Sequence, residues 1–235
     1  MRIHIVGHKG VVGRATYELF KRLGYYVTGS DKGGELDSSA EVYFICVPED
    51  TVEEVVGIIS RKVSGFIVIR SSVVPGTCKR LIKTYTQHVS HNPEFLREAV
   101  ALQDEMNPAR VVIGECCESC GDLLEFLYKP LRVPIIRTDP TTSELTKLAS
   151  NCYLSTVISY WNEIERLAQK LGVSGHQVGM IASMDPRISP YGARLHNRYG
   201  GRCLPKDMEQ LIKFSQSIGY DPVLLKAVEE VNNSL

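Results

Sequence analysis

The stretch "RYGGRCLPKD" holds the strongest candidate for chemistry, a cysteine between two glycines and a proline. Pro205 is typical of the first residue of a helix, so Cys203 is predicted to lie just before a helix N-terminus. That position and the nearby cations Arg202 and Lys206 favour the thiolate, the reactive form of cysteine. A core cysteine would instead sit in an apolar run, as Cys46 does in "FICVP". These features predict that Cys203 is a nucleophile.

Two further pairs of polar residues have spacings that suit an active site. Lys147 and Asn151 are four residues apart in the predicted helix "ELTKLASNCYLS", so both project from one face. A solvated polar stripe is the alternative interpretation of this pair. In "NPEFLRE", Glu94 and Glu98 have the same spacing in a predicted helix, where first-turn carboxylates would also stabilise the helix through its dipole. The two pairs become candidates for chemistry in combination with Cys203.

The turn "GHKGVVG" near the start is similar to the phosphate-binding turn of dinucleotide-binding domains. Gly10 and Gly13 occupy the second and third glycine positions of G-x-G-x-x-G, while His8 stands at the first and Gly7 is displaced by one residue. Asp31 ends the next predicted strand, where a carboxylate can accept hydrogen bonds from the adenosine ribose and repel a 2′-phosphate. A glycine turn that binds no nucleotide is the alternative. The context predicts a site that prefers NAD to NADP.

The elements that must position these residues change in type near residue 140. Up to residue 137, short β-rich runs alternate with helical patterns, which predicts a parallel sheet with helices on both faces. From Ser143 onward only helices are predicted, over about 143–171, 174–183, 205–217 and from 221 to the end. The predicted fold class is α/β, with a Rossmann-like doubly wound parallel sheet followed by a small all-helical domain. The predicted domains are an NAD-binding domain over 1–138 and a helical dimerisation and catalytic domain over 139–235.

The composition excludes several classes of partner. Lys plus Arg and Asp plus Glu both number 27, so no general basic field attracts nucleic acid. No run of 18 apolar residues exists, and "MRIHIVGHKG" is too short in apolar length for a signal peptide, so no membrane span or leader is expected. Seven cysteines without a regular framework favour a reducing cytoplasm. Cys117 and Cys120 form a C-x-x-C with no second such pair, so a surface turn is favoured and no metal is expected.

Five stretches that follow one another along the chain are highly specific. They are "SSVVPGT", "NPEFLREAVALQDEMNPARVVIG", "ELTKLASNCYLSTVISYWNEI", "DPRI" and "GGRCLPKD". In them the chain resembles the UDP-glucose/GDP-mannose 6-dehydrogenase family, over most of its length. The resemblance implies a 6-phosphogluconate dehydrogenase-like fold and an enzyme that oxidises a nucleotide-sugar primary alcohol to a carboxylate, in two steps with two NAD.

The resemblance also implies a role for each candidate residue. Cys203 would attack the aldehyde formed by the first hydride transfer, and the thiohemiacetal would yield a second hydride and a thioester that water cleaves. Lys147 and Asn151 would stabilise the developing oxyanion, and Asp207 would orient a water or share the first proton removal. Glu98 would be the carboxylate tied to thioester hydrolysis, and Glu94 would be its neighbour at the sugar. Ser72 would supply a hydroxyl where the family usually has threonine. The implied cofactor contacts are Gly7, Gly10, Val11, Val12, Gly13, Asp31, Lys32, Val47, Pro48 and Ser71.

The predicted helix over 143–171 also bears on assembly. It carries Tyr153, Tyr160 and Trp161 among aliphatic residues, which is more apolar surface than a small helical domain covers by itself. A homodimer that uses this helix or the C-terminal one is therefore predicted.

The sequence departs from the family in three places. The segment between Asp31 and "AEVYF" is much shorter, the glycine fingerprint is shifted, and the sequence stops in the helix that leads to the family's nucleotide-sugar-binding domain. A short form without that domain is expected. Two other functions stay open: a two-electron hydroxy-acid dehydrogenase of the 6-phosphogluconate dehydrogenase-like class, which needs no Cys203, and a non-catalytic NAD-binding module. Two NADH per sugar nucleotide would indicate the 6-dehydrogenase, one would indicate the hydroxy-acid dehydrogenase, and none would indicate the non-catalytic module.

Overall fold

The computed structural model of the chain describes residues 1–193 and 197–234, which fold as two compact units. Unit 1 comprises Met1–Lys147 and unit 2 comprises Leu148–Leu235. The division falls inside one long helix, α6 (Pro140–Lys170), and the domain boundary at residue 138 stays a prediction. Across the described part of the chain, no helix is both long and apolar enough to cross a membrane.

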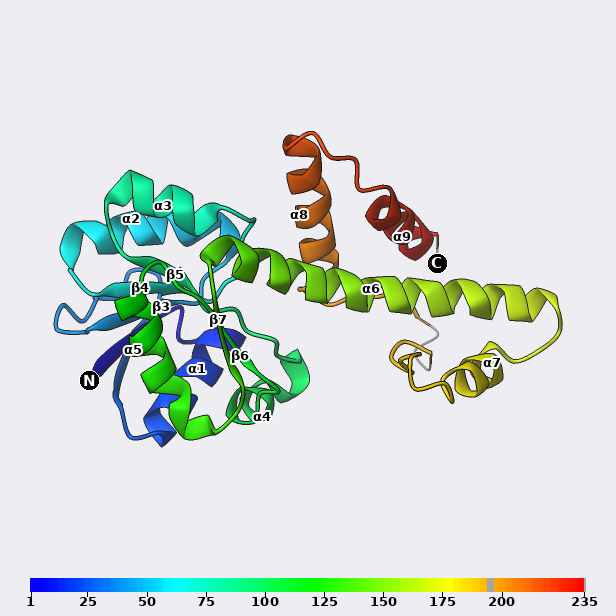
Figure 1. Cartoon of the computed structure of the whole chain (residues 1–235), viewed down its shortest axis with the longest axis horizontal. Coiled ribbons are helices and arrows are strands. Elements are labelled where there is room, and N and C mark those ends of the chain that lie inside the picture. Colours follow the sequence, from blue (N-terminus) through cyan, green and yellow to red (C-terminus); the bar gives the residue numbers. More distant parts are fainter. Residues whose placement is uncertain (194–196, 235) are drawn as a thin grey trace. The chain divides into compact units, whose positions relative to one another are not determined.

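Unit 1 is built on a seven-stranded sheet with the order β2-β1-β3-β4-β5-β6-β7 (Figure 1). The strands are β1 (Arg2–Val6), β2 (Tyr26–Ser30), β3 (Val42–Ile45), β4 (Phe66–Ile69), β5 (Val89–His91), β6 (Val111–Gly114) and β7 (Ile135–Thr138). Neighbouring strands pair in parallel except β5 and β6, which are antiparallel with His91 opposite Gly114. The predicted Rossmann-like sheet is confirmed, with one antiparallel joint that the sequence analysis did not predict.

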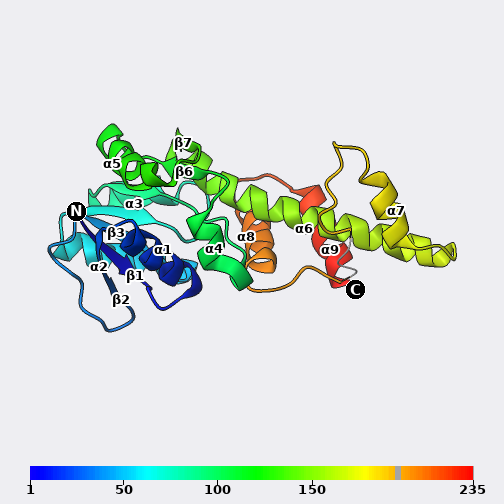
Figure 2. The same ribbon diagram turned by 90° about the horizontal axis from the view of Figure 1, so that it is seen from below.

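Helices cover both faces of this sheet (Figures 1 and 2). They are α1 (Val11–Arg22), α2 (Val52–Lys62), α3 (Thr77–Tyr85), α4 (Ala101–Met106) and α5 (Glu118–Tyr128). Successive strand residues point to opposite faces. Tyr43 and Ile45 of β3 thus pack with α2 and α3, while Val42 and Phe44 pack with α1 and α5. Because both faces are buried, β3, β4 and β6 are continuous apolar runs rather than alternating ones.

Unit 2 consists of helices around one apolar cluster. Besides the later part of α6, its helices are α7 (Gly175–Ala182), α8 (Leu204–Ser217) and α9 (Val223–Asn233). Each begins and ends within a few residues of its prediction, so the all-helical second half is confirmed for the residues described. The cluster joins Leu148 and Ile158 of α6 to Met208 and Leu211 of α8 and to Val228 of α9.

Candidate active site

The glycine turn between β1 and α1 is tightly packed on one side and open on the other. Gly7 has a φ of +85°, and a Cβ there would lie 2.4 Å from the backbone oxygen of Cys46. A Cβ on Gly13 would lie 2.1 Å from the backbone oxygen of Gly7. Gly10 is the N-cap of α1, and among the described residues no side chain caps this helix and no acidic residue lies in its first turn. Backbone N–H groups of a helix N-terminus bind phosphate, so the turn fits a pyrophosphate.

Asp31 lies directly after β2 and contacts the histidine of the glycine turn. Its Oδ2 is 2.7 Å from His8 Nδ1, and the two side chains are 29% and 28% exposed. The His8 ring also lies against Gly29, where a Cβ would come within 2.6 Å of the ring Cγ. The histidine at the first fingerprint position therefore holds the Asp31 carboxylate at the end of β2, accessible to a ribose.

The other predicted cofactor residues lie at the same end of the sheet. Val11 and Val12 follow β1, and Lys32 follows β2. Val47 and Pro48 follow β3, and Ser71 follows β4. Ser71 Oγ donates to the backbone oxygen of Val47 at 2.6 Å, which ties the loops after β3 and β4 together. Ligands of open α/β sheets bind at the carboxyl ends of the strands. The residues present thus fit NAD.

A buried polar network supports the loop that follows β5. Arg70, 3% exposed, donates from Nη1 to Asn92 Oδ1 at 2.6 Å and to Tyr128 Oη at 2.7 Å. Its Nη2 donates to both carboxylate oxygens of Glu105, at 2.8 and 2.9 Å. Burial by itself lowers the pKa of Arg70, but the Glu105 carboxylate beside it raises that pKa above its ordinary value. The guanidinium is therefore charged, and it orients the Asn92 side chain at the start of the loop.

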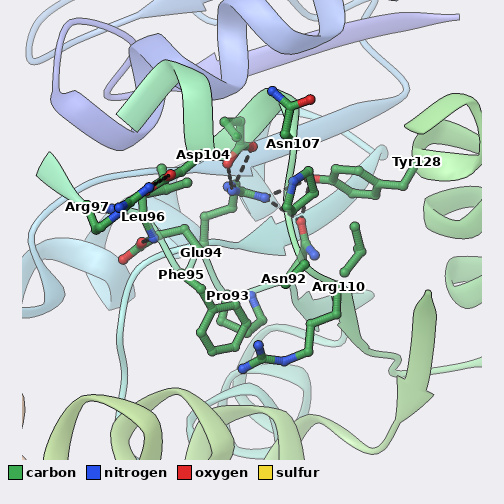
Figure 3. A pocket seen from close by; sticks show the side chains of 15 residues that line it. Asn92, Pro93, Glu94, Phe95, Leu96, Arg97, Asp104, Asn107, Arg110 and Tyr128 are labelled. Carbon is green, nitrogen blue, oxygen red and sulfur yellow. Dashed lines mark hydrogen bonds and ion pairs between the residues drawn. The ribbon is translucent and has the colours of Figure 1, made fainter. Parts of the chain in front are cut away.

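A cavity of about 340 Å³ opens beside this network (Figure 3). The loop over residues 92–97 and the segment 107–111 line it, together with parts of the network. The Arg110 guanidinium carbon lies 4.1 Å from the centroid of the Phe95 ring, a cation–π contact. Arg97 is paired with Asp104 at 2.6 Å. The lining holds three arginines, three carboxylates and an aromatic face, so a cavity of this size suits a polar small molecule.

The predicted helix over "NPEFLRE" is wrong, because residues 92–97 form a loop. Asn92, the first residue of this stretch, is 1% exposed and bonded to Arg70. Glu94 Oε2 accepts from the backbone N–H of Leu96 at 2.7 Å, a local turn. Glu98 is exposed at the start of the short helix η2 (Glu98–Val100). Glu94 and Glu98 therefore do not share a helix face.

Glu94 is brought to Lys147 by the fold. Lys147 Nζ is 2.8 Å from Glu94 Oε1, and the side chains are only 3% and 8% exposed. The ammonium also lies 5.5 Å from the centroid of the Phe95 ring. A buried, paired lysine is held in one position with its charge little screened by water. It can therefore stabilise negative charge on an adjacent ligand oxygen.

In unit 2 the predicted residues gather at the N-terminus of α8. Cys203 is the N-cap of this helix and is exposed, and its predicted place just before a helix N-terminus is confirmed. The fully buried Asp207 accepts at Oδ2 from Asn151 Nδ2 at 2.6 Å, and its Oδ1 is 2.7 Å from Lys206 Nζ. The ion pair and the amide thus compensate the buried carboxylate. Asn151 follows Lys147 by one turn of the continuous helix α6.

Two buried residues of unit 1, Glu144 and His91, were missed by the sequence analysis. Glu144 accepts from the backbone N–H of Gly76 at 2.5 Å and of Cys78 at 2.8 Å, and so caps α3 and fixes the loop that carries Ser72. His91 Nδ1 is 2.9 Å from Ser143 Oγ. Burial lowers the pKa of His91 to about 3, so the ring is neutral. Glu144 precedes Lys147 by three residues on the predicted helix, and that spacing was the available signal.

Comparisons with known families agree with this arrangement. The family model for the NAD binding domain of the UDP-glucose/GDP-mannose dehydrogenase family matches residues 34–132, and the model for that family's central domain matches residues 141–234. The first match confirms NAD as the predicted cofactor of unit 1.

Individual relatives point the same way. A UDP-glucose 6-dehydrogenase of Bacillus subtilis is 36% identical over 176 residues, which are 72% of this chain and 40% of the relative. A GDP-mannose 6-dehydrogenase of Pseudomonas syringae is 35% identical over 181 residues, 72% of this chain and 41% of the relative. The structure of a UDP-glucose dehydrogenase from Pyrobaculum islandicum matches with a TM-score of 0.94 and 28% identity, over 99% of this chain and 68% of that one.

The chain spans about 40% of the length of the two curated relatives. Within that span, the two family models follow each other in the order of the two units and together match most of the residues. The Lys147–Glu94 pair and the N-terminus of α8 both lie in stretches that had suggested this relationship. The chain belongs to the UDP-glucose/GDP-mannose dehydrogenase family.

Proposed function

We propose that the chain oxidises the C6 primary alcohol of a nucleotide sugar to a carboxylate with NAD. The observation that carries this proposal is the exposed Cys203 thiol at the N-terminus of α8, beside a buried Asp207 that holds Asn151. A two-electron dehydrogenase has no use for such a thiol. Two oxidations at one carbon do need a covalent stage, because a free aldehyde would hydrate or escape. The UDP-glucose and GDP-mannose 6-dehydrogenases among the relatives support this class of substrate.

The proposed reaction forms one bond to the Cys203 sulfur after the first oxidation and breaks it after the second. The first oxidation removes a proton and a hydride from the C6 alcohol and leaves an aldehyde. The Cys203 sulfur adds to the aldehyde carbon, and loss of a second hydride from that carbon gives a thioester. Water then cleaves the C–S bond, which releases the acid and restores the thiol. NAD supplies the hydride acceptor for each of the two oxidations.

The polar residues around these steps would handle charge and protons. An amide NH₂ has two donors, and the bond from Asn151 to Asp207 fixes the amide plane and directs the second donor. Asn151 and the Lys147 ammonium would both stabilise the oxyanion that forms when sulfur adds. Asp207, Glu94, Glu98 and Ser72 would orient the substrate hydroxyl and the attacking water.

The stoichiometry of NADH tests the proposed function. The purified chain is incubated with NAD and either UDP-glucose or GDP-mannose, and NADH is measured against the sugar nucleotide consumed. Two NADH per sugar and a sugar acid detected by mass spectrometry are expected. One NADH per sugar would point to a two-electron dehydrogenase, and none would overturn the proposal.

Asp31 is expected to make NAD bind at least about tenfold more tightly than NADP, because the 2′-phosphate would place up to two negative charges beside the carboxylate. The Asp31→Ser variant should lose most of this preference. Isothermal titration with each dinucleotide measures both. Glu35→Ser is a matched control, since Glu35 is an exposed acid in the same loop, and it should keep the preference. Equal affinity of the unmodified chain for NAD and NADP would refute the assignment of Asp31 to the ribose.

A homodimer through α6 is also expected. Tyr153, Tyr160 and Leu167 recur every seven residues and are 57%, 56% and 56% exposed, so they form one apolar stripe along the helix. Burial of such a stripe favours association. Light scattering during gel filtration should show a dimer, and Tyr160→Glu should weaken it at least about tenfold, because a buried unpaired charge costs more than 1.4 kcal/mol. Gln169→Glu, outside the stripe, should not. A monomer at all concentrations would contradict this assembly.

A further inference from the structure

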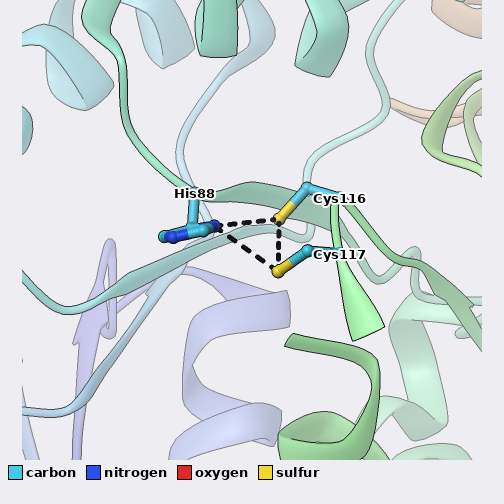
Figure 4. A group of neighbouring side chains, drawn as sticks. All are labelled: His88, Cys116 and Cys117. Carbon is cyan, nitrogen blue, oxygen red and sulfur yellow. Dashed lines mark hydrogen bonds between the residues drawn. The ribbon is translucent and has the colours of Figure 1, made fainter. Parts of the chain in front are cut away.

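Three side chains with nitrogen and sulfur donors converge at the joint between β5 and β6 (Figure 4). His88 directly precedes β5, and Cys116 and Cys117 lie between β6 and α5. His88 Nδ1 is 3.5 Å from Cys117 Sγ and 3.8 Å from Cys116 Sγ, and the two sulfurs are 3.8 Å apart. His88 is exposed and both cysteines are half-buried, so an ion can reach the cluster from solvent. The proposed oxidation uses none of the three.

These separations are those of ligands around a tetrahedral zinc ion. Zn–S bonds of about 2.3 Å and Zn–N bonds of about 2.0–2.1 Å at tetrahedral angles put two sulfurs about 3.8 Å apart and a sulfur about 3.6 Å from a nitrogen. The three observed distances match these edges to about 0.2 Å, the tolerance expected of a metal site. A disulfide would need sulfurs about 2.05 Å apart, so the observed spacing is not that of a bonded pair. Thiolate and imidazole donors select zinc over magnesium or calcium.

The backbone explains why the donors meet. In an antiparallel pair the sequence numbers of facing residues have a constant sum, so the His91–Gly114 pair places His88 opposite Cys117 when the register is extended. Ser90 Oγ accepts from the Cys116 backbone N–H at 3.1 Å and is 3.1 Å from Cys120 Sγ. These contacts tie the segment between β6 and α5 to β5. The donors thus lie just beyond the ends of two paired strands, within three residues of β5 or β6.

We propose that His88, Cys116 and Cys117 bind one zinc ion, with a water molecule or another small ligand in the fourth position. The ion would clamp the only antiparallel joint in the described sheet, where β5 and β6 share a single register pair. A metal bound to both sides would join the ends of this short ladder, so its binding would stabilise the folded chain. The C-x-x-C of Cys117 and Cys120 does not predict this site, because the two sulfur ligands are adjacent in sequence and His88 precedes them by 28 and 29 residues.

Zinc content and affinity test the site directly. The whole chain is stripped with a chelator under reducing conditions, reloaded with Zn²⁺ and analysed by elemental mass spectrometry. One zinc per chain is expected. Loss of a residue that only hydrogen-bonds to a metal ligand weakens metal binding roughly 10–100-fold. Loss of a ligand itself should cost more, so we expect a larger effect from each of His88→Ala, Cys116→Ser and Cys117→Ser. Cys203→Ser and His176→Ala, which change an exposed thiol and an exposed imidazole elsewhere, should keep the zinc.

Cobalt substitution reports the ligands, and thermal unfolding reports the role. Co²⁺ should give the visible bands of tetrahedral coordination and a near-ultraviolet thiolate band that Cys117→Ser reduces by half. At a hundredfold excess over Kd, zinc should raise Tm by about 5–10 °C in the unmodified chain and in Cys203→Ser, and not in His88→Ala. His88 is exposed, so this variant is expected to fold, which circular dichroism checks.

Several results would overturn the zinc site, and none depends on activity towards a nucleotide sugar. They are a failure to bind zinc stoichiometrically, binding that survives unchanged in all three ligand variants, and an octahedral cobalt spectrum. A Cys116–Cys117 disulfide in chain purified without oxidant, together with no uptake of zinc after reduction, would assign the cluster to thiol oxidation instead.

Discussion

The Cys203→Ser variant is expected to lose acid formation by about a thousandfold or more, while NAD binds with unchanged affinity. A serine hydroxyl has a far higher pKa than a thiol and is a poor nucleophile without a matched base, so the aldehyde would not be trapped. The first hydride transfer does not require sulfur and should persist weakly. The glycine turn and Asp31 belong to unit 1, whereas Cys203 belongs to unit 2, so binding should not change. Mass spectrometry of products and calorimetric titration of NAD measure the two effects.

A matched control lies on the same helix. Ser217→Ala at the opposite end of α8 should leave acid formation unchanged, since this exposed hydroxyl is far along the helix from Cys203. Brief alkylation adds a second readout, because exposed Cys203 should react well before Cys152, whose pKa burial raises to about 12. Retention of more than a tenth of the acid formation by Cys203→Ser would remove the covalent stage from the proposal.

Local patterns in the sequence were sufficient for half of the candidate site. Pro205 placed Cys203 correctly at a helix N-terminus because the preference of proline for the first turn acts within a few residues. The glycine spacing likewise placed the turn before α1. Pairings across long stretches of chain could not be read in this way. Nothing in "NPEFLRE" indicates that Glu94 pairs with a lysine 53 residues later.

The fold shows the same division between local and distant causes. Strands buried on both faces form apolar runs, and these were predicted. The three-residue strand β5 has no such run. The helix α3 is capped by Glu144, which lies 66–68 positions further along the chain than the backbone groups it binds. The failed helix over "NPEFLRE" has a similar origin, since Asn92 satisfies Arg70 in the core instead of capping its own segment. Tertiary hydrogen bonds outweighed a local preference worth about 1 kcal/mol.

The Arg70→Met variant is expected to lower the free energy of unfolding by about 3–5 kcal/mol, because it leaves the buried Glu105 carboxylate without its partner. Asn92 and Tyr128 lose a donor at the same time. Burial raises the pKa of Glu105 even beside Arg70, and removal of the cation should raise it further. The folded state then binds more protons than the unfolded state, so the variant loses stability as pH rises above the ordinary value for a glutamate. Urea unfolding at pH 5 and pH 8 measures the loss, which should be larger at pH 8.

The double variant Arg70→Met/Glu105→Met separates the missing charge partner from lost packing. Replacement of a buried ion pair by apolar side chains of similar volume is often neutral, so the double variant should recover most of the stability and lose the extra sensitivity to pH. Equal destabilisation at both pH values, or a double variant at least as unstable as the sum of the single ones, would mean that the ion pair is not what Arg70 contributes. The loop over residues 92–97 carries Glu94 and lines the cavity, and Asn92 at its start depends on Arg70. Recovery of stability in the double variant without recovery of acid formation would therefore identify Arg70 as a positioning residue for that loop.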